Sequence, residues 1–243
     1  MSPLFEELDR RKTAMGDLVL RRRRMLALNA VTVYEVKLGD EYLMSSLFHS
    51  SEVALADIGL GELGGSGWDV VVGGLGLGYT AAAALKFEQV KRLVVVEALA
   101  PVIDWHRRNL VPNGQALNDD ERCVYRHADF FALARSDGFD PETAGYRFDA
   151  VLLDIDHTPA FLLHASHGDF YSAAGLHRLK SFLKPDGVFA LWSNDPPRED
   201  FVRKLSSVFA TAEGHTIEFQ NPLRQSYASN GIYVARTCNG GRF

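Results

Sequence analysis

Short apolar runs alternate with segments of helical composition from Trp68 onward. The runs at 70–72 and 93–96 consist of valine and leucine, which is typical of strands that are buried on both faces. Strands that alternate with helices form a parallel sheet with helices on both sides, so we expect a doubly wound α/β fold. The expected strands span 69–73, 92–97, 122–127, 148–154 and 186–193, and the expected helices span 78–87, 101–110, 130–135, 171–182 and 198–210.

The pattern differs at the start of the chain. The segments 17–28 and 31–37 predict two strands, the second of them rich in β-branched residues. A helix is expected over 51–60, with Ser50 or Ser51 as its N-cap. The chain should therefore open with a short β region before the doubly wound sheet begins.

The pattern differs again near the other end. Glu213–Gln220 and Gly231–Arg236 are consecutive strand patterns with only a loop between them, which predicts an antiparallel hairpin at the sheet edge. A mostly parallel sheet that ends in such a hairpin is typical of the Rossmann-like class I methyltransferase fold. We expect a short N-terminal β-strand region over residues 1–48 and a methyltransferase-like domain over residues 49–243.

Composition narrows the function classes. The net charge of −5 and the pI near 5.9 argue against general nucleic-acid binding. Cys123 and Cys238 are far apart with no second pair, so neither a zinc cage nor a disulfide framework is indicated. The first residues lack the apolar core of a signal peptide, and no uncharged apolar stretch approaches the ~20 residues that span a bilayer. We expect a soluble, cytoplasmic protein with no membrane partner.

A glycine-rich turn follows the first expected strand of the sheet and contains Gly73, Gly74, Gly76 and Gly78. Glycines let the backbone approach a ligand closely, and the helix that follows directs unpaired N–H groups toward it. Glu97 ends the next expected strand, where a carboxylate can accept hydrogen bonds from both hydroxyls of a ribose. Together these features predict a nucleoside-binding site.

The glycine turn is ambiguous when it is taken alone. Gly74-x-Gly76-x-Gly78 fits the methyltransferase turn, but Gly76-x-Gly78-x-x-Ala81 also satisfies the dinucleotide pattern. An NAD-dependent oxidoreductase therefore remains an alternative. A turn that needs glycine only for packing remains another.

Asp129 follows the third expected strand. A carboxylate at this place can accept the exocyclic N–H of an adenine while a neighbouring aromatic ring packs on the base. The alternative is an N-cap for the helix expected over 130–135. We favour the adenine role.

Asp154, Asp156 and His157 follow the fourth expected strand. Ligands of open α/β sheets lie beyond the carboxyl ends of the strands, so Asp154 should project into the cleft. If the extended backbone continues, Asp154 and Asp156 share a face, and two close carboxylates can hold a cation or act as a base. Asp154 could instead be structural, Asp156 a loop cap and His157 uninvolved.

Two other groups of residues have simpler explanations. His164 and His167 have metal-like spacing with Asp169, but they lack a fourth partner at a diagnostic distance, so we expect a solvated lid loop and no metal. The basic run Arg21–Arg24 could bind phosphate. Exposed edge strands, however, also carry such charges to prevent pairing with other chains, and we favour that explanation.

The order of these motifs resembles the spermidine/spermine synthase (polyamine aminopropyltransferase) family, a branch of the class I methyltransferase fold. The resemblance covers most of residues 35–195. Gly73–Gly78 stands at the family's GGGDGG, Val95–Glu97 at its ribose acid, His127–Phe130 at its GDA-type adenine segment, Phe148–Asp154 at its YDVIIxD strand, Phe170–Val188 at its LYTxEFY…LxPGG segment, and Gly39–Tyr42 at its DEF turn.

The resemblance implies a set of roles. Glu97 would hold the ribose, Asp129 the adenine, and the backbone of Gly73, Gly74, Gly76 and Gly78 the remainder of the donor. Asp154 would be catalytic, with Asp156 or His157 assisting, and Tyr171 would contact substrate. The donor would be S-adenosylmethionine or its decarboxylated form, the acceptor an amine, and the assembly a homodimer.

The departures from the family all lie on the acceptor side. Gly76 replaces the acid within GGGDGG, Met44-Ser45-Ser46 replaces Tyr-His-Glu, and the DSxDP segment is altered from Ile155 to Pro159. Because each desolvated ammonium needs a carboxylate partner, these losses make putrescine doubtful as a substrate. We therefore expect a spermidine-synthase-like transferase. The alternatives are a small-molecule methyltransferase using S-adenosylmethionine and a non-catalytic nucleoside-binding protein.

Overall fold

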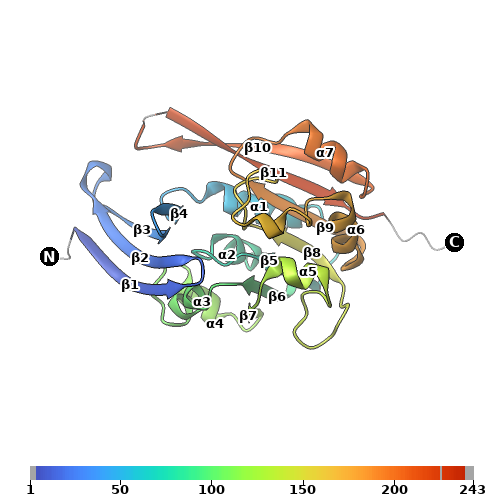
Figure 1. Ribbon diagram of the computed structural model, residues 1–243, viewed down its shortest axis with the longest axis horizontal. Coiled ribbons are helices and arrows are strands. Elements are labelled where there is room, and N and C mark those ends of the chain that lie inside the picture. The colour runs from blue at the N-terminus through green and yellow to red at the C-terminus, as the bar shows by residue number, and fades with distance from the viewer. Residues whose placement is uncertain (1–3, 225, 239–243) are drawn as a thin grey trace.

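The computed structural model describes residues 4–224 and 226–238. Residues 1–3 and 239–243, the outermost parts of the two expected domains, lie outside it. The described chain forms a four-stranded antiparallel sheet and a seven-stranded, mostly parallel sheet (Figure 1). None of the helices formed by the described residues has the length and apolarity required to cross a bilayer.

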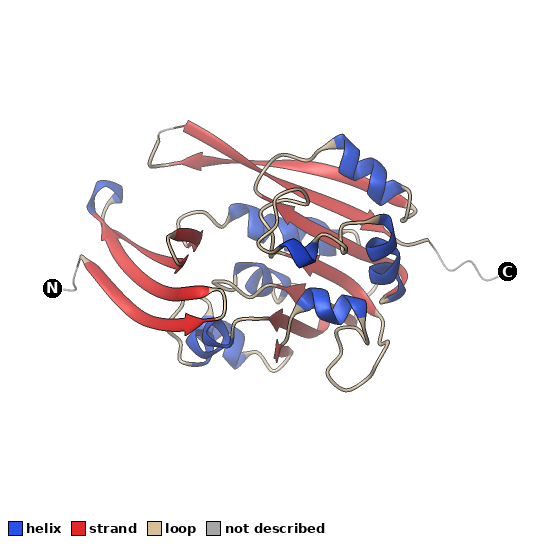
Figure 2. Cartoon of the chain, viewed as in Figure 1, coloured by secondary structure: helices blue, strands red, loops and turns tan. Residues whose placement is uncertain are grey.

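The larger sheet has the strand order β10-β11-β9-β8-β5-β6-β7, with helices on both faces (Figure 2). The doubly wound α/β fold expected from the sequence is confirmed. Its strands are β5 (Trp68–Gly73), β6 (Val90–Glu97), β7 (Cys123–His127), β8 (Phe148–Leu153), β9 (Leu183–Ser193), β10 (Thr211–Asn221) and β11 (Ser226–Arg236). Its helices are α1 (Ser50–Gly61), α2 (Tyr79–Ala84), α3 (Ala100–Arg107), α4 (Gly114–Asp119), α5 (Phe130–Arg135), α6 (Ala173–Ser181) and α7 (Glu199–Ser206).

Alternate residues of the central strands face opposite layers of helices. Val70 and Val72 pack into a core that includes Trp105 of α3, whereas Val71 packs into a second core that includes Phe130 of α5. All of these side chains are at most 1% exposed. Burial on both faces explains why these strands have continuous apolar sequences rather than alternating ones.

The hairpin expected near the C-terminus is confirmed. β10 pairs with β11 along its whole length, and β11 pairs antiparallel with β9 only over Gly231–Arg236. The remainder of the ribbon extends past the sheet, toward the side occupied by the N-terminal strands (Figure 1).

The N-terminal sheet has the order β1-β2-β3-β4, formed by Phe5–Thr13, Gly16–Met25, Val31–Leu38 and Glu41–Ser45. β1 was not expected because most of its side chains are charged, and β4 because it is short. The strand expected over 17–28 ends at Met25 and continues as a 3₁₀ turn. Leu18, Leu20 and Val36 join the core shared with α1, so the two sheets are packed together.

Two further local expectations are corrected. α1 begins at Ser50 with His49 as its N-cap and no side-chain capping bond, so neither Ser50 nor Ser51 is the N-cap. The Ser51 hydroxyl instead bonds to Glu52 and Asn230. α4 was not expected at all.

The arginine run is largely neutralised within the N-terminal sheet. Arg21 and Arg23 both form ion pairs with Glu35, at 2.8 and 2.9 Å, and Arg22 pairs with Glu6 at 2.8 Å. β2 pairs with β1 on one side and with β3 on the other, so the expected explanation, charges that protect an exposed edge strand, is corrected. The arginines lie on an interior strand, where their ion pairs link β2 to β1 and β3.

Candidate functional site

A cavity of about 380 Å³ lies where the N-terminal sheet meets the carboxyl ends of the parallel strands. One part of its wall is the glycine turn between β5 and α2, together with the ends of β6 and β8. The opposite part comes from the β1–β2 turn, β3 and β4. The cleft position expected from a parallel sheet is therefore where the cavity lies.

The glycine turn brings main chain to the cavity surface through left-handed backbone conformations. Gly74, Gly76 and Gly78 line the cavity with φ values of 95°, 49° and 84°. A Cβ atom on Gly74 would lie 2.1 Å from the carbonyl oxygen of Asp154, so only glycine fits there. Gly73 completes β5 behind this surface and does not line the cavity.

Two side chains donate hydrogen bonds to main-chain carbonyls of the glycine turn. The Gly76 carbonyl accepts a hydrogen bond from His106 Nε2 at 3.0 Å, and the Leu77 carbonyl accepts one from Asn113 Nδ2 at 2.9 Å. Burial lowers the pKa of His106 to about 4, so this imidazole is neutral at pH 7 and donates its Nε2 hydrogen. With these carbonyls bonded to the protein, the turn is held in one conformation before any ligand arrives.

Glu97 lies at the end of β6 in the cavity wall. Its Oε2 accepts from the backbone N–H of Leu75 at 3.0 Å and its Oε1 from that of Leu99 at 2.8 Å. Burial raises the pKa of this carboxyl, and the backbone hydrogen bonds act in the opposite direction. The carboxylate is thus fixed between the glycine turn and the loop before α3, where a sugar could meet it.

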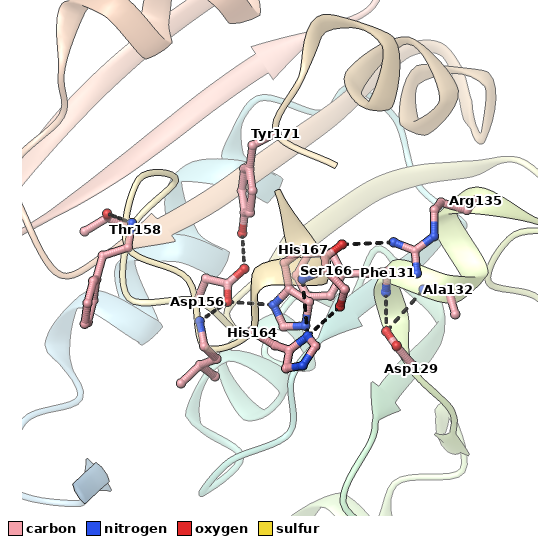
Figure 3. A network of polar contacts seen from close by, with 12 residues as sticks. Asp129, Phe131, Ala132, Arg135, Asp156, Thr158, His164, Ser166, His167 and Tyr171 are labelled. Carbon is pink, nitrogen blue, oxygen red and sulfur yellow. Dashed lines mark hydrogen bonds and ion pairs between the residues drawn. The ribbon is translucent and has the colours of Figure 1, made fainter. Parts of the chain in front are cut away.

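Asp129 serves as the N-cap of α5. Its Oδ1 accepts from the N–H groups of Phe131 and Ala132 at 2.8 and 3.1 Å (Figure 3). Within the described part of the chain its Oδ2 has no hydrogen bond, and the residue lines the cavity. The capping alternative is therefore observed, and it leaves the second oxygen free for a ligand.

Asp154 follows β8 and lines the cavity together with Glu52 of α1. Burial, reinforced by the charge of Glu52, raises the pKa of Asp154 to about 7, although the hydrogen bond from Thr80 Oγ1 at 3.0 Å opposes this shift. Burial also raises the pKa of Glu52. A carboxyl with a pKa near 7 can accept a proton at neutral pH, as a general base must.

Asp156 does not share the cavity with Asp154. Its side chain is inaccessible and accepts hydrogen bonds from His167 Nδ1, the Tyr171 hydroxyl and the Leu163 N–H, each at 2.8 Å (Figure 3). β8 ends at Leu153, so the strand alternation that would place Asp154 and Asp156 on one face does not continue. The expected catalytic role of Asp156 is corrected to that of a buried anchor for the loop after β8.

Tyr171 is corrected for the same reason. Its ring is 3% exposed, its hydroxyl donates to Asp156, and it does not line the cavity. It anchors the far end of the loop and has no surface to offer a substrate.

Three histidines of this loop line the cavity. The His157 ring stacks on Phe161, with the ring centroids 5.1 Å apart, and the His167 ring stacks on Phe131 at 3.8 Å. His164 and its neighbour Ser166 complete this part of the wall. No group of three or more potential metal ligands occurs among residues 4–224 and 226–238.

The charged side chains of the cavity wall are all acidic. They are Glu52, Glu97, Asp129 and Asp154. Lysine and arginine are absent from the wall formed by the described residues. Such a cavity favours a cationic ligand and disfavours phosphate or carboxylate groups.

Sequence reasoning missed Glu52 in this wall, and it named Met44 only within a segment that departs from the resembling family. Glu52 is the one acid in the first turn of α1, which is a weak signal because acids are common there for electrostatic reasons. Met44 faces the glycine turn, and a Cβ atom added at Gly76 would lie 2.9 Å from its sulfur. Its thioether thus occupies space beside the position where the resembling family has an acid.

Comparisons with known proteins agree with the fold. No protein-family model and no curated protein matches the sequence. The spermidine synthase from Thermotoga maritima superposes with a TM-score of 0.70 and 17% identity, covering 95% of this chain and 72% of that one. A spermidine synthase in complex with the transition state analogue AdoDATO gives the same TM-score and identity, covering 95% and 73%. The chain therefore has a spermidine-synthase-like fold.

Proposed function

We propose that this chain is a transferase that moves an aminopropyl group from decarboxylated S-adenosylmethionine to an amine. The observation that carries the proposal is the charge of the cavity: four carboxyl groups and, among the described residues, no lysine or arginine in the wall. A sulfonium donor and an amine acceptor are both cationic, so both match this wall. The spermidine-synthase-like fold supports the same reaction class.

The donor half of the cavity fits an adenosine. Glu97, held by two backbone N–H groups, would accept the ribose hydroxyls through its remaining lone pairs. The free Oδ2 of Asp129 would accept the exocyclic N–H of the adenine. The backbone of Gly74, Gly76 and Gly78 would lie against the rest of the donor.

The chemical step asks little of the protein beyond alignment and removal of a proton. The donor supplies a carbon that is already activated by a positively charged sulfur, and that sulfur keeps the electron pair of the broken C–S bond. The acceptor ammonium first gives a proton to the Asp154 carboxylate, and its nitrogen then forms the new N–C bond with the lone pair that this releases. Thr80 orients this carboxylate, and Glu52 helps to hold the incoming cation.

One feature favours a second candidate, a methyltransferase that uses intact S-adenosylmethionine. The ammonium of an aminopropyl tail would find no acid at Gly76, where Met44 supplies only a thioether. Against this candidate, the α-carboxylate of the intact donor would have no lysine or arginine partner in the described wall and would lie in an acidic cavity. We therefore place the aminopropyl reaction first.

Calorimetric titration with both donors tests the choice. We expect the decarboxylated donor to bind at least ~10-fold more tightly, and incubation with an amine panel to release 5′-methylthioadenosine. Tighter binding of intact S-adenosylmethionine, with release of S-adenosylhomocysteine, would instead establish the methyltransferase. Donor binding without turnover would indicate a non-catalytic nucleoside-binding protein. The cytoplasmic location and the homodimer expected from the sequence stay predictions.

A further inference from the structure

The acceptor side of the cavity has an apolar wall. The N-terminal sheet and its first turn contribute Met15, Val36, Leu38, Leu43 and Met44. Across the cavity from this sheet, the Gly76 backbone is covered by the Met44 thioether, with 2.9 Å between the sulfur and the position of a Cβ on Gly76. The wall that an acceptor body would touch therefore offers dispersion contacts and no charge.

The acids available to an acceptor are few. In the proposed function the remaining lone pairs of Glu97 receive the ribose hydroxyls, and the Oδ2 of Asp129 receives the adenine. Among the described wall residues this leaves Glu52 and Asp154. Thr80 Oγ1 lies 3.3 Å from the main-chain carbonyl oxygen of Glu52 and 3.0 Å from Asp154 Oδ2, so the two residues lie side by side in the wall and offer one cation site.

Neutral groups surround this cation site. Trp192 lines the cavity, and its Nε1 donates to Ser51 Oγ at 2.9 Å, which in turn donates to Glu52 at 2.8 Å. Tyr79 lines the cavity as well, and its ring stacks on His49 with 4.2 Å between the centroids. If a ligand places a single ammonium at Glu52 and Asp154, the rest of that ligand therefore lies in a space bounded by an indole, a phenol and aliphatic side chains.

We propose that the acceptor is a primary monoamine with an apolar body, and not a diamine or a polyamine. This inference rests on the proposed function and adds the class of acceptor. The amine group lies at Glu52 and Asp154, and the body lies against Leu43, Met44 and Val36. The second ammonium of a diamine is excluded because it would lose water beside a wall that gives it no carboxylate.

Hexylamine and cadaverine form a matched pair of probes, because they have the same length and differ by a methyl group in place of one ammonium. We expect hexylamine to bind at least ~10-fold more tightly by calorimetry to the protein saturated with 5′-methylthioadenosine, the spent donor. Equal or tighter binding of cadaverine overturns the proposal. Failure of both amines to bind overturns it as well.

Substitution of Met44 gives the sharper test. Met44→Glu places a carboxylate on the apolar wall, and Met44→Gln changes the shape in the same way without the charge. We expect M44E to reverse the preference in favour of cadaverine and M44Q to keep the preference for hexylamine. Identical behaviour of the two variants, with thermal unfolding showing both to be folded, overturns the role assigned to this wall.

Binding and turnover separate the two proposals. If hexylamine binds preferentially but no 5′-methylthioadenosine is released from the decarboxylated donor, the acceptor class stands and the transfer reaction fails. If methylthioadenosine is released most rapidly with cadaverine, the transfer reaction stands and the acceptor class fails.

Discussion

The two halves of the cavity, to which the proposed function assigns the donor and the acceptor, are built in different ways. The donor half consists of consecutive strand–turn–helix units, in which Gly74–Gly78, Glu97 and Asp129 follow β5, β6 and β7 in turn. The acceptor half is assembled from the N-terminal sheet, the first turn of α1, the end of β8 and Trp192 of β9. Its parts are far apart in sequence.

The two halves also differ in how firmly their acids are held. Glu97 and Asp129 each accept two backbone N–H bonds, which fix the positions of their carboxylates. Asp154 accepts only one hydroxyl bond, and burial, reinforced by the charge of Glu52, raises its pKa to about 7. Under the proposed function, the donor half holds its ligand with carboxylates that the backbone fixes in place, whereas the acceptor half presents a carboxyl that can exchange a proton.

The largest expected effect comes from removing the proton acceptor. Asp154→Asn should reduce kcat by roughly 10³-fold, about 4 kcal/mol, because the amide cannot take the amine proton. Donor affinity should change less than about 3-fold, since Asp154 belongs to the acceptor half. Single-turnover kinetics with parallel calorimetry measure both quantities. If kcat and donor affinity fell by the same factor, Asp154 would belong to both halves of the cavity and the division would be wrong.

The next effect in size concerns donor binding. Glu97→Gln should weaken donor affinity by roughly 30- to 100-fold, about 2–3 kcal/mol, because an amide NH₂ cannot accept from Leu75 or Leu99 and leaves an N–H without its partner. Binding of hexylamine to the free protein should be nearly unchanged and serves as the control. If the affinities for the donor and for hexylamine fell by the same factor, the division of the cavity into two halves would be contradicted.

The smallest effect is on the pH profile. Burial and, after it, the charge of Glu52 raise the pKa of Asp154, so Glu52→Gln, which removes that charge, should lower this pKa. Since activity requires the deprotonated carboxylate, kcat/KM should rise with pH through about 7 in the unmodified protein, and the variant's rise should move to lower pH by up to about one unit, or ~1.4 kcal/mol. An unchanged midpoint would show that Glu52 does not act on Asp154.

The difference between the halves also explains what could be predicted from the sequence. Strand composition alone predicts the doubly wound sheet, because strands that are buried on both faces must be apolar throughout. Glu97 and Asp129 follow directly, since residues after neighbouring parallel strands meet at one edge of the sheet. Asp154 was placed at the cavity by the same reasoning, and the structure brings all three to its wall.

The acceptor half could not be predicted in this way. Glu52 has no local pattern that distinguishes it from an ordinary acid in the first turn of a helix, and Met44 becomes meaningful only once β4 is known to face the glycine turn. Asp156 was placed wrongly because the end of β8 at Leu153 cannot be located to one residue from composition, and one residue decides which face a side chain takes. Tyr171 was placed wrongly because its buried partner is that same carboxylate.

The three cavity-lining glycines of the turn differ in how well they would tolerate a side chain, and Gly76 is the most tolerant. A side chain at Gly74 would collide with the main chain at Asp154, and one at Gly78 with the packed ring of His106, whereas one at Gly76 meets only the flexible end of Met44. Aspartate tolerates a left-handed backbone better than most residues, and a glycine codon can become an aspartate codon by a single nucleotide change. A lineage descended from this chain could therefore acquire an acid here, and with it a new substrate, without rebuilding the turn.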